Sequence, residues 1–72
     1  MQILVFKTNL SNRKRVKLIS PLFHNHPVIR DWSVDLEDCD RILRIVALGP
    51  VNEGEIIYMM NMCGYYCELL ND

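Results

Sequence analysis

The sequence has few of the features that nucleic-acid-binding, membrane or secreted proteins require. Its formal net charge is only −1, so no overall positive field attracts nucleic acid or an anionic membrane. Apolar runs such as Ile3–Phe6 are far too short to cross a bilayer, and no long apolar segment of a secretory signal follows the start. We therefore expect a soluble cytoplasmic protein with no nucleic-acid or membrane partner.

The cysteines do not form a paired set, and the familiar patterns of catalytic side chains are absent. The three cysteines, Cys39, Cys63 and Cys67, are odd in number and irregularly spaced, which argues against a disulfide framework. No Ser-His-Asp, Cys-His or paired-carboxylate arrangement is legible, and the carboxylates between Asp35 and Asp40 are typical of a solvated hairpin tip. We therefore predict free thiols in a reducing compartment, no enzymatic activity and no cofactor.

Apolar residues, by contrast, are plentiful and regularly spaced. Half of the 72 residues are hydrophobic, which favours one folded domain over residues 1–72. Consecutive apolar residues predict a strand over Gln2–Thr8, and alternation predicts strands over Trp32–Leu36 and Arg41–Leu48. A fourth strand is predicted over Tyr65–Leu70.

A first helix is predicted to begin at Ser11, whose hydroxyl can accept a free backbone N–H, and to end between His24 and Pro27. Its apolar stripe consists of Val16, Ile19, Leu22 and Phe23. Pro21 predicts a kink or a break near Ser20, because proline lacks an N–H group and clashes with the preceding turn.

A second helix is predicted after Asn52, which can cap it, with two glutamates in the first turn against the positive end of the helix dipole. Gly64 is the predicted stop. The apolar stripe consists of Ile56, Met59, Met60 and Cys63. We expect Cys63 and Cys67 to face the core.

The element order predicts an α+β, ferredoxin-like βαββαβ fold, with a four-stranded antiparallel sheet and two helices on one face. This topology puts the turn before the first helix, the hairpin around Cys39 and the Cys63–Tyr65 turn at one end. His24 and His26 then lie at the opposite end. RNA-recognition domains share the topology, but they stack bases on strand aromatics, and Arg41–Leu48 contains none.

Three segments follow one another in an order known from a group of small domains. They are "SVDLED" (Ser33–Asp38), "RILRIV" (Arg41–Val46) and "MMNMCGYYCEL" (Met59–Leu69). Together they resemble the second strand, the third strand and the second-helix exit of the heavy-metal-associated domains of copper chaperones and metal-transporting ATPases. The resemblance spans nearly the whole chain and implies the same ferredoxin-like fold.

The resemblance fails at the loop that binds metal in that family. The family has Met-Thr-Cys-x-x-Cys there, and this chain has "LSNRKR", with Leu10 and Ser11 in the Met and Thr positions and Asn12 and Arg15 replacing both cysteines. Thiolates hold Cu(I) or Zn(II), whereas asparagine is a poor soft-metal ligand and arginine is a permanent cation. We therefore expect no metal at Asn12 and Arg15.

Four other residues are weaker metal candidates. Cys39 and Cys63 fall at the same end of the predicted fold, and His24 and His26 lie near the end of the first helix. Core packing of Cys63 and solvation of the histidines are the favoured interpretations. A divergent heavy-metal-binding or metal-transport protein that uses Cys39, Cys63 or His24/His26 is the alternative function.

Cations crowd the start of the first helix. Free N–H groups beside Arg and Lys side chains favour an anion, so a phosphate or anion site is predicted as a further alternative, with a solvated basic face as the simpler interpretation. The candidate residues are Ser11, Arg13, Lys14 and Arg15.

The sheet face away from the helices is predicted to be apolar, although Lys7, Arg44 and Glu68 interrupt it. Its candidate interface residues are Ile3, Val5, Ile42, Val46, Tyr66 and Leu70. Contiguous apolar surface usually marks an interface, so we predict a protein partner or a homodimer there. The leading functional prediction is a non-enzymatic interaction or regulatory module that resembles heavy-metal-associated domains.

Overall fold

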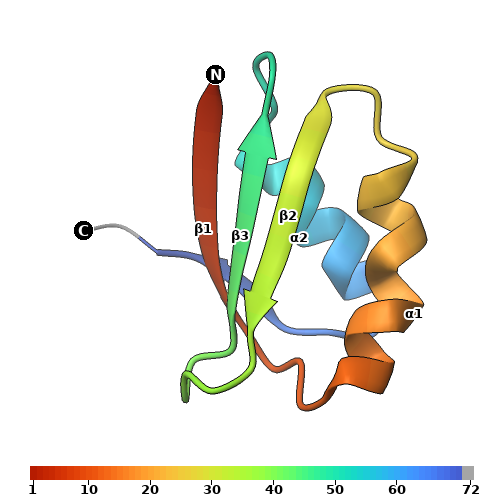
Figure 1. Ribbon diagram of the computed structural model, residues 1–72, viewed down its shortest axis with the longest axis vertical. Helices are drawn as coiled ribbons and strands as arrows, with labels where there is room; N and C mark the ends of the chain where they lie inside the picture. The colour runs from red at the N-terminus through yellow and green to blue at the C-terminus, as the bar shows by residue number, and fades with distance from the viewer. Residues whose placement is uncertain (71–72) are drawn as a thin grey trace.

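The predicted alternation of strands and helices is present in the computed structural model, which describes residues 1–70 (Figure 1). In chain order the elements are β1 (Gln2–Thr8), α1 (Arg13–His24), β2 (Ile29–Asp35), β3 (Ile42–Ala47), α2 (Glu53–Met62) and β4 (Cys67–Leu69). All strand pairs are antiparallel, in the spatial order β2-β3-β1-β4. The ferredoxin-like fold is confirmed. No helix within residues 1–70 is long and apolar enough to cross a membrane.

The core lies between the sheet and the helices. Along β3 the pleat alternates as predicted: Leu43, Ile45 and Ala47 are buried, and Arg44 is exposed. The apolar stripe of α1 points the same way, since Ile19 and Phe23 are fully buried. The largest fully buried side chains are Phe6, Phe23, Leu10, Ile19, Leu43, Ile45, Ile56 and Met60.

Helix α1 corrects two sequence predictions. Its N-cap is Asn12 rather than Ser11, because the Asn12 Oδ1 accepts the Arg15 N–H at 3.0 Å. The helix also runs through Pro21 to His24, so of the kink or break predicted near Ser20 the break does not occur. Proline removes a single hydrogen bond here, to the carbonyl of Lys17, and both residues are exposed, so water can solvate that carbonyl.

Helix α2 follows its predicted capping but ends one residue early. The Asn52 Oδ1 accepts the Gly54 N–H at 2.7 Å, as predicted for an N-cap. Gly64 has φ +87°, the left-handed conformation expected of a helix stop. Cys63, however, is the exposed C-cap and not a core residue. Because the helix ends at Met62, Cys63 no longer follows the helical repeat that would have buried it.

The two edge strands differ from their predicted lengths. Strand β2 begins at Ile29, earlier than predicted, and a bulge at Arg30 shifts its register against β3. Just beyond the bulge the Asp31 carboxylate accepts the Trp32 N–H at 2.9 Å. Strand β4 covers only Cys67–Leu69.

Hydrogen bonds join three segments at one end of the molecule, as the topology predicts. The Thr8 N–H donates to the Asp40 carbonyl at 3.0 Å, and the Thr8 hydroxyl donates to the Arg41 carbonyl at 2.6 Å. The Tyr66 N–H donates to the Asn9 Oδ1 at 2.9 Å. The turn before α1, the β2–β3 hairpin and the start of β4 therefore form one connected surface.

Candidate functional site

The turn between β1 and α1 is anchored by a buried leucine and closed by an asparagine cap. Leu10 is fully buried, and its N–H donates to the Thr8 hydroxyl at 3.3 Å. The side-chain oxygen of Asn12 is already engaged with the Arg15 N–H, and Arg15 lies exposed in the first turn of the helix. Asn12 and Arg15, the residues that the sequence resemblance aligns with the family's thiols, therefore form an ordinary helix start.

The basic cluster (Arg13, Lys14, Arg15 and Lys17) is fully solvent-facing, and no acidic residue lies in the first turn of α1. An open hollow of about 390 Å³ lies beside it, lined by Asn12, Lys14, Arg15 and Leu18. Of the predicted anion-binding residues, Lys14 and Arg15 line this hollow, whereas Ser11 and Arg13 do not. Anion binding here stays a prediction.

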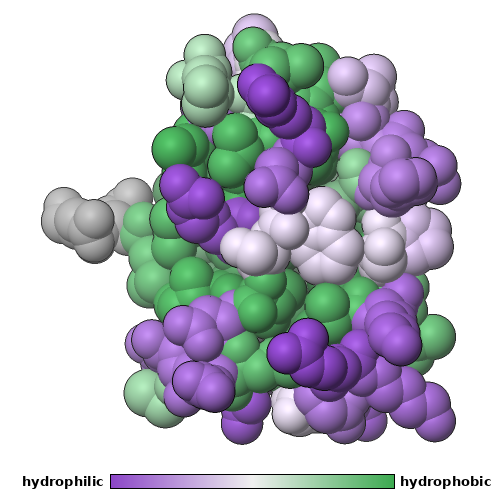
Figure 2. All heavy atoms as spheres, viewed as in Figure 1, coloured by the Kyte–Doolittle hydropathy of each residue, from purple (hydrophilic) through white to green (hydrophobic). Residues whose placement is uncertain are grey.

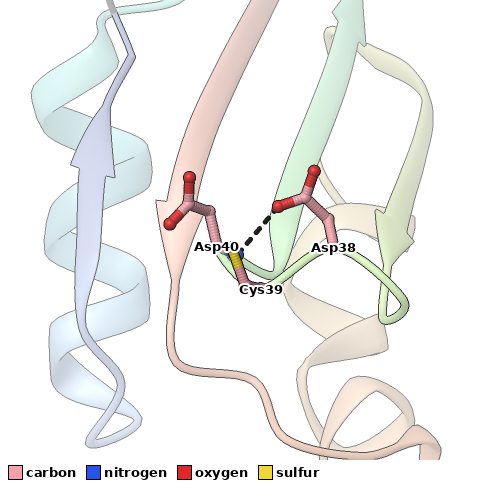
Figure 3. Close-up of side chains that lie close together, drawn as sticks. All are labelled: Asp38, Cys39 and Asp40. Atoms are coloured by element: carbon pink, nitrogen blue, oxygen red, sulfur yellow. Dashed lines mark hydrogen bonds between the residues drawn. The ribbon is translucent and has the colours of Figure 1, made fainter.

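The β2–β3 hairpin brings together three potential metal ligands, Asp38, Cys39 and Asp40 (Figure 3). One ligand atom from each lies within 4.8 Å of the others. The Asp38 Oδ1 accepts the Asp40 N–H at 2.8 Å, and the Asp40 carboxylate lies 3.4 Å from the Lys7 ammonium. One thiol and two carboxylates are ligands that Zn(II) accepts, but both carboxylates already have partners in the chain.

The other predicted ligands lie outside this group. Among residues 1–70, neither Cys63 nor the two histidines join a group of three potential ligands. The His26 Nδ1 accepts the Val28 N–H at 3.3 Å, and its Nε2 lies 3.2 Å from the Glu55 carboxylate. His26 thus joins the chain after α1 to the start of α2, with the proton of the neutral ring on Nε2. His24 lies exposed in the last turn of α1.

The three cysteines differ in exposure, and so we expect them to differ in reactivity. Cys39 and Cys63 are exposed, whereas Cys67 is 7% exposed, and burial raises the pKa of its thiol to about 11. Since only the thiolate reacts, iodoacetamide at pH 8 should modify two thiols quickly and Cys67 at least about 100-fold more slowly. Intact-mass spectrometry measures this. All three should react alike in denaturant, and rapid triple modification of the native protein would contradict the burial of Cys67.

The sheet face opposite the helices carries the predicted interface residues. We call this surface, made of Ile3, Val5, Ile42, Val46, Tyr66 and Leu70, the open face. Ile3 is 50% exposed and Tyr66 48%, and every member is at least partly exposed. The Tyr66 hydroxyl donates to the Glu68 carboxylate, and this hydrogen bond raises the pKa of Tyr66. Figure 2 shows hydrophobic surface over β1 and its neighbours, interrupted by hydrophilic side chains.

Comparisons with known proteins bear on the fold. No family model matches the chain. No curated protein matches it either. The chain is similar to a solved structure described as "Crosstalk between Cu(I) and Zn(II) homeostasis", with a TM-score of 0.80 and 11% sequence identity. The match covers 97% of this chain and 100% of that chain, so the likeness confirms the ferredoxin-like fold over nearly all of both.

Proposed function

We propose that the chain is a non-enzymatic protein-interaction module, related to heavy-metal-associated domains but without their metal-transfer loop. The observation that carries the proposal is the hydrogen bond from the Arg15 N–H to the Asn12 Oδ1. This hydrogen bond uses the Asn12 side chain as a helix cap. The other replaced position is occupied by Arg15, whose side chain ends in a guanidinium. Neither side chain supplies a soft ligand.

The charge around the loop supports the same conclusion. The basic cluster adds four cations to a helix end whose free N–H groups already carry partial positive charge. A bare Cu(I) or Zn(II) ion at this position would be repelled by both. The loop is therefore suited to contact with an acidic or polar surface and not to holding a metal cation.

Metal titration tests the proposal. Reduced protein should show no Cu(I) or Zn(II) affinity tighter than about micromolar in competition with a chelator of known affinity. The Asn12→Cys/Arg15→Cys variant should gain affinity by about 1,000-fold or more, because two thiolates then face each other across the helix start. Binding tighter than about micromolar by the natural chain that is lost in Asn12→Ala would overturn the proposal.

The hairpin group Asp38, Cys39 and Asp40 favours a second candidate, a divergent metal-binding protein, because its ligand atoms already lie within 4.8 Å. The same titration separates the two functions. Metal binding at the hairpin predicts an affinity tighter than micromolar that disappears in Cys39→Ser. The same affinity should persist in the matched control Cys63→Ser. Both cysteines are exposed, so neither substitution disturbs the core.

A further inference from the structure

The open face has an ordered layout of charge that bears on its occupant. Strand β2 presents Asp31, Ser33 and Asp35 on this face, opposite Val46, Arg44 and Ile42 of β3. Strand β1 then presents Ile3 and Val5, opposite Val46 and Arg44 on the other side of β3. The face is therefore acidic along one edge strand and mainly apolar over the two central strands, with a cation between the apolar residues.

Arg44 is the cation on this face that lacks a charged partner within the described chain. Lys7 lies 3.4 Å from the Asp40 carboxylate, and Glu68 accepts the Tyr66 hydroxyl. Within residues 1–70 no carboxylate lies within 4.0 Å of the Arg44 guanidinium. An entirely apolar partner would leave this cation desolvated and unpaired, which is strongly unfavourable. A partner that brings a carboxylate to Arg44 avoids this cost.

A second copy of this chain can supply that carboxylate. A two-fold interface joins the same patch on both subunits, so the patch must be complementary to itself. The open face has both elements, because the unpaired Arg44 lies one strand away from Asp31 and Asp35, which no cation approaches within 4.0 Å in the described chain. A two-fold axis that runs diagonally across the strands, between Arg44 and Asp31, pairs each Arg44 with an aspartate of the other copy. It also sets Ile3 and Val46 of the two copies against each other, because Asp31, Val46 and Ile3 lie in one row across the sheet.

The size of the face is also sufficient. The described chain measures 29 × 28 × 19 Å, and viewed down its shortest axis the strands lie in front of α2 (Figure 1). One broad face of such a body carries roughly a fifth of the 4825 Å² accessible surface, on the order of 1,000 Å², whereas a standard interface needs about 800 Å² from each partner.

We propose that the open face binds a second copy of this chain, with Arg44 of each copy against Asp31 or Asp35 of the other. The inference rests on the proposed function, because it names the partner of an interaction module. The occupant is the second subunit of a homodimer, and a chain that stays monomeric would point instead to a different protein with an acidic surface.

The experiment measures solution mass by sedimentation velocity from about 10 μM to about 1 mM, a range over which a dimer with a dissociation constant of about 100 μM forms from mostly monomeric chain. We expect the mass to rise from that of the 8.5 kDa monomer towards twice that value. Ile3→Glu should weaken association by about tenfold or more. The matched control Leu18→Glu makes the same chemical change at a 65% exposed site on α1 and should leave association unchanged.

A charge exchange tests the pairing itself. Arg44→Glu should weaken the dimer, and adding Asp31→Arg and Asp35→Arg should restore it, while circular dichroism confirms that each variant is folded. A chain that stays monomeric at about 1 mM, or a folded triple variant that does not recover, overturns this inference. Neither result bears on the metal titration, and tight binding of metal at the β1–α1 loop would overturn the proposed function without changing the mass.

Discussion

Replacing Phe23 with alanine should leave a large fraction of the molecules unfolded at room temperature. Phe23 is fully buried on α1, and its ring lies 5.3 Å from that of Trp32 on β2, at an interplanar angle of 52°. Removing a buried phenylalanine costs about 3–5 kcal/mol, and a domain of this length has a total stability on the order of 5 kcal/mol. The substitution therefore removes most of the free energy that keeps α1 against the sheet.

Urea denaturation followed by fluorescence measures the effect, because Trp32 is the only tryptophan in the chain. Leu18→Ala is the control, since it shortens a side chain on the exposed side of the same helix and should change stability by less than about 0.5 kcal/mol. A loss below about 1 kcal/mol for Phe23→Ala would show that α1 does not pack on β2 in this way.

Thr8→Val should destabilise the end of the molecule that holds the candidate sites. Thr8 is a buried residue, with 5% of its surface exposed. Its hydroxyl donates to the Arg41 carbonyl and accepts a hydrogen bond from the Leu10 N–H. Valine keeps the shape but leaves both backbone groups without that partner, at a cost of about 1–3 kcal/mol for each group that stays dry. We expect a loss of roughly 2 kcal/mol in the free energy of unfolding.

Two measurements check the Thr8 prediction. Urea denaturation gives the size of the loss, and amide hydrogen exchange should show faster exchange at Leu10 and in the hairpin than in α2. Ser11→Ala is the matched control, because it removes an exposed hydroxyl from the same turn. Equal losses for the two variants would mean that the Thr8 hydroxyl does not join the turn to the hairpin.

Local periodicity was enough to predict the fold and much of its core. The alternation of Leu43, Arg44 and Ile45 placed β3 in the sheet with the correct face inward, and the Asn52 cap and Gly64 stop bounded α2 to within one residue. These features depend on residues close together in the chain, and their physical causes can be read from the sequence directly.

The misses involve competition between neighbours or contacts between distant segments. Ser11 and Asn12 can both cap a helix. In the structure Asn12 is the residue with the extended backbone of an N-cap, and its side chain accepts the Arg15 N–H. The roles of His26 depend on Glu55, 29 residues away, and no local pattern reveals such a pair. The hairpin group had a weak signal in the sequence, since Asp38 and Asp40 flank Cys39 within one predicted turn. The prediction of a solvated acidic tip agrees with the exposure of Asp38, but it did not foresee the grouping of three potential ligands.

The bulge in β2 has a consequence for how this protein avoids fibrils. An edge strand with free N–H and C=O groups is a template on which other chains can add as further strands. Here the bulge at Arg30 breaks the regular edge, and Asp31 occupies the Trp32 N–H, so an incoming strand finds an interrupted row of donors. Growth by strand addition is therefore hindered at the longer of the two sheet edges.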